Sequence, residues 1–278
     1  MNTPVLHGYD DPVPARNGDA DPAGTPNGWF VRLERREQAR ARLYVFPHAG
    51  GGPGALGPLA TALPETIEPW VLSLPGRQAR LAEPPRTDLE PLVAELAADL
   101  NDDAAVRPGY RAFFGYCGGA LLAYLTALRS TPQRLVVGSF AAPDVALVPR
   151  RLHLLPGNTF WDVVLAQGGV PPELARADLR PVFEGALRAD FALYADYRHR
   201  PTGPLDAPIS VIFGRDDDTL SRGSLLGWRR HSTSRPDMCD LTVGHWLVDD
   251  DPAVVAACLA DRINTDLRAA GQTPGAPA

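Results

Sequence analysis

The sequence predicts an α/β protein in which helices flank a mostly parallel central sheet and a helical cap is inserted into the core. Short apolar runs alternate with helical patterns along the 278 residues. Runs that are apolar almost without interruption predict strands buried on both faces, as in parallel sheets. These runs are Leu43–Phe46, Trp70–Leu74, Ala112–Phe114, Leu135–Phe140, Ile209–Phe213 and Leu241–Val243.

Five segments are expected along the chain. Residues 1–28 are rich in Pro, Gly and Asp without periodicity and predict a flexible leader, and residues 269–278 predict a flexible tail. Residues 29–142 and 206–268 hold the predicted strands and form the two parts of the core. Residues 143–205 carry mostly helical patterns between two strands, which indicates a cap that excludes water and shapes a substrate tunnel.

Two helices have clear start signals. Thr87 and Glu90 have the spacing of a capping box, and an apolar helical face follows them. Asp251 and Pro252 suit the N-cap and the first position of a second helix. Cys258 lies on the apolar stripe of this second helix, so we expect its thiol to be packed in the core.

Composition narrows the class of function. The net charge of −6 gives no support for nucleic-acid binding, and no apolar run approaches the ~20 residues needed to span a membrane. All 27 basic residues are arginine, which excludes a P-loop lysine and a Schiff-base lysine. The first residues lack the regions of a signal peptide, and the three cysteines form no CxxC pair. We therefore expect a monomer in the reducing cytoplasm.

A metal site is not predicted. The six histidines do not cluster along the chain, and the acidic run Asp216–Asp218 lacks the pattern of a calcium loop. The second acidic run, Asp249–Asp251, directly precedes a helical pattern and is better explained by capping.

A nucleophile elbow is indicated by the run Gly115-Tyr116-Cys117-Gly118-Gly119. It follows the apolar run Ala112–Phe114 and precedes a helical pattern. Glycines permit the sharp strand–turn–helix connection that presents the central side chain at the top of a sheet. Because Cys117 stands where serine is usual, the sequence predicts covalent catalysis through sulfur.

A thiol nucleophile needs a base, and the base needs an orienting group. His245 follows the last apolar run and a glycine, and it is the expected base. The acid follows the preceding run, at Asp216, Asp217 or Asp218, and the Gly-x-x-Asp spacing favours Asp217. The order nucleophile, acid, histidine is that of an α/β hydrolase, with all three at the carboxyl ends of strands.

Two backbone N–H groups are expected to stabilise the oxyanion of a tetrahedral intermediate. Gly118, directly after the nucleophile, supplies one of them. The glycine-rich loop Phe46–Gly52 supplies the other, and Ala49 is its best candidate. We expect His48 to shape this loop rather than to act as a base.

Aromatic residues of the elbow and the cap are candidates for the substrate-binding surface. The alternative for each is that it only packs the cap against the core. The candidates are Tyr116, Phe160, Trp161, Phe191 and Tyr194.

From about Trp29 to Ile263 the chain resembles type II thioesterases of polyketide and nonribosomal peptide pathways. The shared pieces are Phe46–Gly51, Pro75–Arg77, the elbow, Gly168–Leu174, Leu187–Phe191, Gly214–Asp217 and Gly244–His245. The resemblance implies an α/β-hydrolase enzyme that edits acyl groups held on the phosphopantetheine of an acyl or peptidyl carrier protein, without a tightly bound cofactor. It implies catalytic roles for Cys117, Asp217 and His245, and oxyanion donation by Ala49 and Gly118.

The elbow departs from the family pattern Gly-His-Ser-Met-Gly. Tyr116 replaces histidine, Cys117 replaces serine and Gly118 replaces methionine. The loss of the methionine is expected to open space beside the nucleophile. An acyl group on sulfur remains an activated thioester that water, a thiol, an amine, an alcohol or a carbon nucleophile can accept. Three functions stay open: a hydrolase with an acyl-S-Cys117 intermediate, a Cys-dependent acyltransferase or release cyclase, and a non-catalytic carrier-binding protein.

The carrier domains on which this family acts are commonly acidic. The resemblance therefore implies a locally basic docking face on this chain, despite its net negative charge. The candidates are Arg150, Arg151, Arg77 and Arg80. The alternative for each is a solvated arginine without a partner role.

Overall fold

The computed structural model describes residues 24–25, 27–107, 109–168, 170 and 176–272. Its centre is a seven-stranded sheet of order β1-β3-β2-β4-β5-β6-β7. The strands are β1 (Phe30–Arg32), β2 (Ala41–Phe46), β3 (Ile67–Leu72), β4 (Tyr110–Tyr116), β5 (Arg134–Gly138), β6 (Ile209–Gly214) and β7 (Asp237–Leu241). Strands β2 to β7 are parallel, and only β1 pairs antiparallel, with β3. The predicted α/β fold is confirmed.

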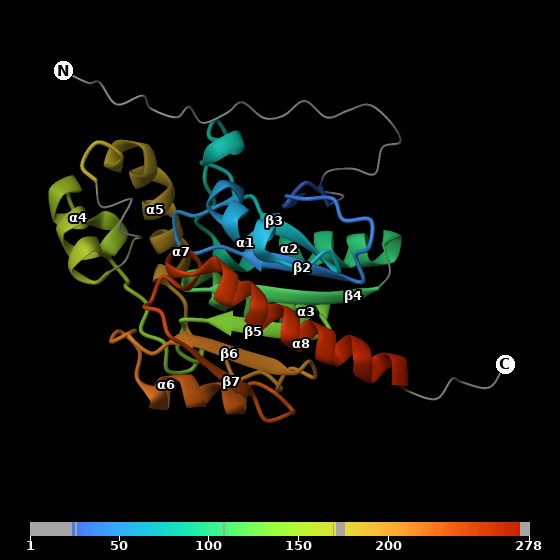
Figure 1. Ribbon diagram of the computed structural model, residues 1–278. Coiled ribbons are helices and arrows are strands. Elements are labelled where there is room, and N and C mark those ends of the chain that lie inside the picture. The colour runs from blue at the N-terminus through green and yellow to red at the C-terminus, as the bar shows by residue number, and fades with distance from the viewer. Residues whose placement is uncertain (1–23, 26, 108, 169, 171–175, 273–278) are drawn as a thin grey trace, which may run out of the picture.

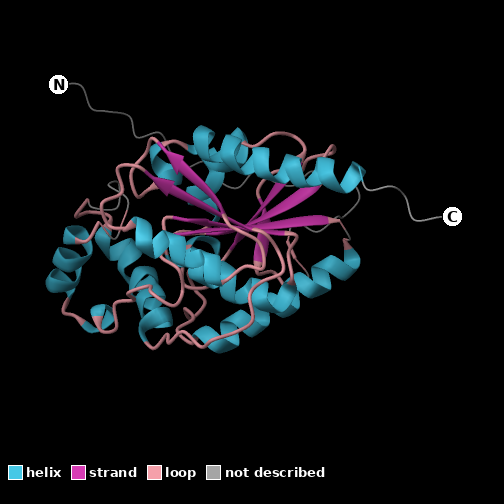
Figure 2. Cartoon of the chain, turned by 90° about the horizontal axis from the view of Figure 1, so that it is seen from below, coloured by secondary structure: helices cyan, strands magenta, loops and turns pink. Residues whose placement is uncertain are grey.

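Helices cover both faces of this sheet (Figure 2). On one face α2 (Leu89–Val106) packs against α3 (Gly118–Ser130), and on the other α1 (Gly57–Ala62) packs against α8 (Pro252–Gln272). Because both faces are covered, every residue of β2 and β3 is buried. The core accordingly consists of one large apolar cluster on each side of the sheet.

A helical segment stands between β5 and β6. It contains η3 (Leu152–Leu154), α4 (Gly157–Ala166) and α5 (Arg180–Ala195), which form a third apolar cluster. Figure 1 shows α4 and α5 beyond the end of the sheet toward which the arrow of β5 points. The remaining elements are η1 (Pro53–Leu56), η2 (Gln78–Arg80), α6 (Arg222–Leu226), η5 (Gly227–Arg230) and α7 (Leu247–Asp250).

Several sequence expectations fall outside the described residues. They concern most of the shared piece Gly168–Leu174, because residues 169 and 171–175 are not described. They also concern residues 1–23 and 26 of the expected leader and residues 273–278 of the expected tail. Within the tail, α8 continues to Gln272, so residues 269–272 are helical rather than irregular.

Two local predictions were wrong. The last strand was expected at Leu241–Val243, but β7 spans Asp237–Leu241. It lies at the edge of the sheet and is partly exposed, so its sequence lacks an apolar run. The capping box at Thr87 does not form, because α2 begins at Leu89 with Asp88 as its N-cap and no side-chain cap bond.

The start of α8 was predicted correctly. Asp251 Oδ1 accepts hydrogen bonds from the N–H groups of Ala253 at 3.1 Å and Val254 at 3.0 Å. The thiol of Cys258 on this helix is buried, as expected, and it donates to Cys239 Sγ at 3.1 Å.

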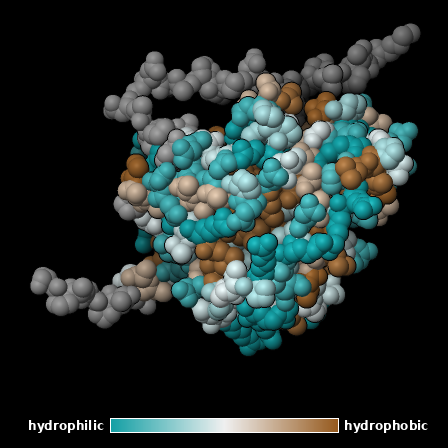
Figure 3. Space-filling view, turned by 180° about the vertical axis from the view of Figure 1, so that it is seen from behind, coloured by the Kyte–Doolittle hydropathy of each residue, from teal (hydrophilic) through white to brown (hydrophobic). Residues whose placement is uncertain are grey.

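Within the described part of the chain, no helix is both long and apolar enough to cross a membrane. Figure 3 shows the face turned away in Figure 1, where apolar residues are visible between hydrophilic ones.

Candidate active site

Cys117 occupies a strained turn between β4 and α3. Its backbone angles are φ 52° and ψ −135°, in a region that non-glycine residues rarely adopt. The N–H of Cys117 donates to the Gly138 carbonyl at 2.9 Å, which fixes the turn against β5. The structure thus contains the strand–turn–helix elbow that the sequence indicates.

Two glycines of the elbow are required by close packing. A Cβ at Gly119 would lie 2.2 Å from the Phe46 carbonyl oxygen, and one at Gly115 would lie 2.3 Å from the Gly119 carbonyl oxygen. Real Cβ atoms do not approach backbone oxygens this closely. The contact at Gly119 packs the elbow tightly against the loop that follows β2, where the second oxyanion donor is expected.

The structure brings Cys117, Asp217 and His245 together. They follow β4, β6 and β7, at the carboxyl ends of these strands. His245 Nδ1 lies 2.8 Å from Asp217 Oδ2, and Cys117 is close enough to His245 to influence the charge of the ring. The geometry selects Asp217 among the three aspartates, because Asp216 and Asp218 are exposed whereas the Asp217 side chain is only 1% exposed.

The hydrogen bonds of the site control its charges. Burial favours the neutral imidazole, but the interactions with Asp217 and Cys117 outweigh it and raise the pKa of His245 to about 10. Burial also works against the Asp217 carboxylate, but hydrogen bonds from His245 and Thr219 hold its pKa below the ordinary value. The raised pKa favours the charged form of His245 at neutral pH.

Thr219 completes this network and was missed in the sequence. Its N–H and its hydroxyl donate to Asp217 Oδ1 at 3.0 Å and 2.5 Å, and the hydroxyl lies 3.2 Å from His245 Nδ1. Threonine two residues after an aspartate is the spacing of an Asx turn, which is the signal that could have identified it. Thr219 fixes the carboxylate so that its other oxygen faces the imidazole.

The two expected oxyanion donors have free backbone N–H groups. Among the described residues, neither Ala49 nor Gly118 donates its N–H to a protein acceptor. The Gly118 N–H is unbonded because it lies at the first position of α3. Both residues lie near the elbow. Gly118 directly follows Cys117 in the sequence. Ala49 belongs to the loop whose Phe46 and Pro47 carbonyl oxygens pack against Gly119.

His48 shapes the oxyanion loop, as expected. Its Nδ1 lies 2.9 Å from the Ala49 carbonyl oxygen, and its carbonyl accepts the Gly51 N–H at 2.9 Å. The ring lies edge-on against Tyr116 and Trp246. Burial lowers the pKa of His48 to about 4, so the ring is neutral at physiological pH.

Three of the aromatic candidates are buried in the packing of the protein. Tyr116 is 1% exposed, stacks on Phe114 and lies in the core cluster beneath the elbow. Phe160 and Trp161 are buried in the apolar cluster of α4 and α5. Their burial favours the packing alternative, and contact of these three with substrate stays a prediction.

The other two aromatic candidates differ from each other. Phe191 is half-buried and packs edge-on against Phe160 at 6.1 Å between ring centres. Tyr194 covers the residue after the nucleophile, since a Cβ at Gly118 would lie 3.2 Å from Tyr194 Cε2. The space expected from the loss of the family methionine is thus occupied by the Tyr194 ring.

The candidate docking arginines also divide into groups. Arg77 is buried in an ion pair with Asp190, so it cannot meet a partner at the surface. Arg80 is half-buried and pairs with Glu83. Arg150 and Arg151 are exposed in the segment between β5 and η3.

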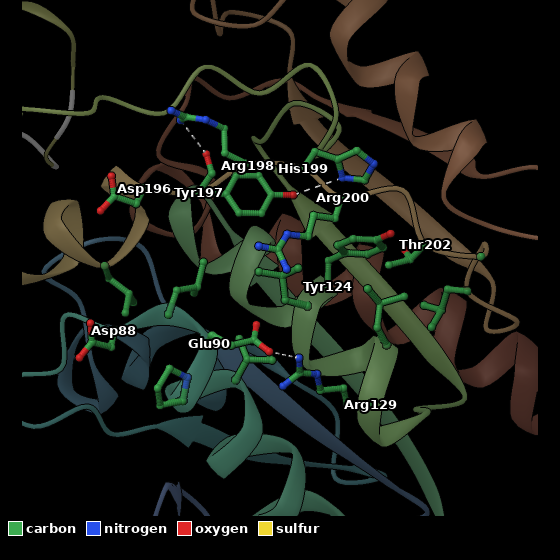
Figure 4. Close-up of a pocket in the computed structure, with 18 of the residues that line it drawn as sticks. Asp88, Glu90, Tyr124, Arg129, Asp196, Tyr197, Arg198, His199, Arg200 and Thr202 are labelled. Atoms are coloured by element: carbon green, nitrogen blue, oxygen red, sulfur yellow. Dashed lines mark hydrogen bonds and ion pairs between the residues drawn. The ribbon is translucent and has the colours of Figure 1, made fainter.

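A cavity of about 1010 Å³ lies elsewhere in the molecule. Its walls come from the first turns of α2, the second half of α3 and residues 196–207 (Figure 4). Tyr124, Tyr197 and His199 line it, and none of Cys117, Asp217 and His245 does. The cavity is therefore separate from the triad.

Among the described residues, no group of His, Cys, Asp and Glu could hold a metal ion.

A parallel sheet with a nucleophile elbow, and with an acid and a histidine at later strand ends, defines the α/β-hydrolase class. Within that class, the model of the thioesterase domain family matches residues 41–245. The chain belongs to the thioesterase domain family.

Known relatives agree with this assignment. The chain is 29% identical over 229 residues to the gramicidin S biosynthesis protein GrsT of Aneurinibacillus migulanus, covering 80% of this chain and 88% of that protein. It is 29% identical over 244 residues to thioesterase PikA5 of Streptomyces venezuelae, covering 84% and 85%. The solved structure of the type II thioesterase BorB from the borrelidin cluster is similar with a TM-score of 0.76 and 25% identity, covering 84% of this chain and 97% of that one.

Proposed function

We propose that this protein is a thioesterase that releases acyl groups held as thioesters on a carrier protein of polyketide or nonribosomal peptide biosynthesis. The family assignment and the type II thioesterase relatives support the reaction class. One observation supports the covalent route: His245 is hydrogen-bonded to Asp217 and interacts electrostatically with the Cys117 side chain at the elbow.

In the first half-reaction, the Cys117 thiolate attacks the thioester carbonyl and forms a carbon–sulfur bond. The N–H groups of Ala49 and Gly118 donate to the resulting oxyanion. When this intermediate collapses, the bond to the phosphopantetheine sulfur breaks. The His245 imidazolium gives its proton to the departing thiol, which leaves an acyl-S-Cys117 enzyme and a neutral imidazole.

In the second half-reaction, the neutral His245 imidazole accepts a proton from water as the water oxygen attacks the acyl carbonyl. The same two N–H groups stabilise the second oxyanion. Collapse releases the carboxylic acid and restores the Cys117 thiolate beside a His245 imidazolium. Asp217 holds the ring in place through both half-reactions and stabilises its charged form.

The main alternative is transfer to an acceptor other than water. Acylation of Cys117 converts one thioester into another, so the acyl group stays activated on the enzyme. A carrier thiol, an amine, an alcohol or a carbon nucleophile can then take it, as in an acyltransferase or a release cyclase. The sulfur at the elbow favours this alternative. The arrangement of Cys117, Asp217 and His245 in one site argues against a merely carrier-binding protein.

The partner that this function requires is a carrier protein bearing the phosphopantetheine arm. Arg150 and Arg151 remain candidates for its docking face, because both are exposed and follow the carboxyl end of β5. The protein itself needs no tightly bound cofactor for the two half-reactions, since the reacting groups are side chains and backbone N–H groups. We propose the cytoplasm, where carrier-bound biosynthesis takes place, as its location.

The test is an intact-mass measurement after mixing the protein with an acyl-loaded carrier protein. We expect an acyl adduct on wild-type protein and none on Cys117→Ala. Rapid appearance of free acid without build-up of adduct supports hydrolysis. An adduct that persists until a thiol or an amine is added supports transfer. Neither adduct nor turnover across a broad panel of acyl groups would contradict both reactions.

A further inference from the structure

A buried ion pair joins the helical segment to the loop after β3. Arg77 Nη1 and Nη2 donate to Asp190 Oδ2 and Oδ1, each at 2.6 Å. The two side chains are 6% and 5% exposed. A bidentate pair of this kind is strong and geometrically specific, and it holds α5, which carries Asp190, against the core.

The same pair is bonded to the oxyanion loop. The Gly50 N–H donates to Asp190 Oδ2 at 2.7 Å, and Arg77 Nη1 donates to the Gly51 carbonyl at 3.1 Å. Gly50 has φ 78°, so its backbone bends sharply directly after Ala49. The carboxylate of Asp190 therefore accepts three N–H groups, and one of them belongs to the residue next to the proposed oxyanion donor.

These bonds fix the peptide that follows Ala49 from both sides. Its N–H, which is that of Gly50, is held by Asp190. Its carbonyl, which is that of Ala49, lies at hydrogen-bond distance from His48 Nδ1, at 2.9 Å. With this peptide plane fixed, the direction of the Ala49 N–H is restricted as well. An oxyanion donor contributes only when it is aimed at the place where the charge develops.

We propose that Asp190, held by Arg77, positions the Ala49 N–H for the oxyanion and so makes helix α5 part of the oxyanion hole. The inference rests on the proposed function, because it concerns the tetrahedral intermediates of that reaction. Asp190 and Arg77 are positioning residues, since neither touches the reacting atoms. The competing explanation is that the pair only stabilises the attachment of α5.

Two reactions of the same sulfur separate these explanations. Iodoacetamide alkylates Cys117 by displacement of iodide at a saturated carbon, so no oxyanion forms. A small acyl thioester, such as an acyl-N-acetylcysteamine, acylates Cys117 through a tetrahedral oxyanion and needs no carrier protein. Alkylation is read from the mass of the peptide that contains Cys117, which excludes reaction at Cys239 and Cys258. Acylation is read from the release of N-acetylcysteamine above the rate seen with Cys117→Ala.

Asp190→Asn keeps the shape of the side chain but removes its charge. We expect acylation of Cys117 to slow by about 10- to 100-fold, while alkylation stays within about twofold of wild type. The matched control is Asp266→Asn, which disrupts the bidentate pair of Arg134 and Asp266 between β5 and α8. This control should leave the ratio of the two rates unchanged.

A second variant protects the test against misfolding. Arg77→Met with Asp190→Leu removes both charges at once and leaves neither unpaired in the interior. It should also slow acylation selectively, because the Gly50 N–H loses its acceptor.

Unchanged acylation in both variants, or an equal fall in acylation and alkylation, would overturn the positioning role. A wild-type protein that is alkylated but neither acylated nor able to release free acid from the thioester would overturn the proposed function itself and the inference with it.

Discussion

In the proposed reaction, the chemistry of the site depends on the imidazole of His245. Asp217 Oδ2 lies 2.8 Å from its Nδ1, and Cys117 also contributes to the raised pKa of the ring. These partners favour the charged ring strongly enough to overcome its burial. A charged imidazole fits the proposed mechanism, in which the attacking cysteine reacts as a thiolate and His245 donates a proton to the departing thiol.

The charge of His245 is directly testable. Asp217→Asn removes the anion that favours the imidazolium, so the pKa of His245 should fall from its raised value of about 10. The measurement is an NMR titration of the imidazole nitrogens from below pH 6.5 to above pH 10. With wild-type protein the ring should stay protonated through neutral pH and lose its proton only in the alkaline part of this range.

Asp218→Asn is the matched control, because it removes the same charge from an exposed neighbour of Asp217. The titration of His245 should be the same in this variant as in wild type. If Asp217→Asn also left the titration unchanged, the carboxylate would not be the partner that sets the charge of the ring.

The elbow is the element that places Cys117 beside the loop after β2, which carries a proposed oxyanion donor. Gly119 lies against the carbonyl oxygens of Phe46 and Pro47, which begin the oxyanion loop. The turn at Cys117 is strained, and packing of this kind over-determines such a conformation. The elbow and the oxyanion loop therefore hold one another in place.

Gly119→Ala should unfold or rearrange this element. The new Cβ would lie 2.2 Å from the Phe46 oxygen, and we expect a loss of about 3 kcal/mol or more in the free energy of unfolding. Gly185→Ala on α5 is the control, because a Cβ there meets nothing within 4 Å. This change should instead stabilise the protein by about 0.5–1 kcal/mol. Urea denaturation measures both, and equal midpoints would contradict the packing argument.

Elements buried on both faces could be predicted from the sequence, whereas edge elements could not. Strands such as β2 lie between neighbours and under helices, so burial leaves a continuous apolar run. At the edge of the sheet β7 is partly exposed and carries polar residues. The apolar run that predicts a strand therefore starts only at the end of β7, at Leu241–Val243. The strand β1 was not predicted, because three residues carry too little pattern.

The candidate site divides in the same way. Cys117, Asp217 and His245 have local signals, namely the elbow glycines and the ends of apolar runs. The contact between Arg77 and Asp190 joins positions 113 residues apart, and no local pattern encodes that pairing. The filling of the space at Gly118 by Tyr194 is likewise a tertiary contact. The sequence therefore indicates the proposed reacting groups, whereas the tertiary contacts that position and enclose them have no local signal.

In the whole molecule, the carboxyl edge of the sheet is where the functional parts meet. The elbow, the acid and the histidine lie at this edge, and α4 and α5 stand beyond it in Figure 1. A carrier protein that delivers its phosphopantetheine arm to Cys117 must approach the same edge. Arg150 and Arg151 follow the carboxyl end of β5 and are exposed, so they are placed to meet an acidic partner.

Reversing these two charges should impair delivery without affecting the chemistry. For Arg150→Glu with Arg151→Glu we expect kcat/KM with an acyl-loaded carrier to fall on the order of tenfold at low salt, because steering of the acidic partner is lost. Turnover of a small acyl thioester should stay the same. Arg40→Glu with Arg235→Glu makes the same change in net charge at two exposed sites just before β2 and β7, at the opposite edge of the sheet. An equal fall in both double variants would show that total charge, rather than this face, governs the encounter with the carrier.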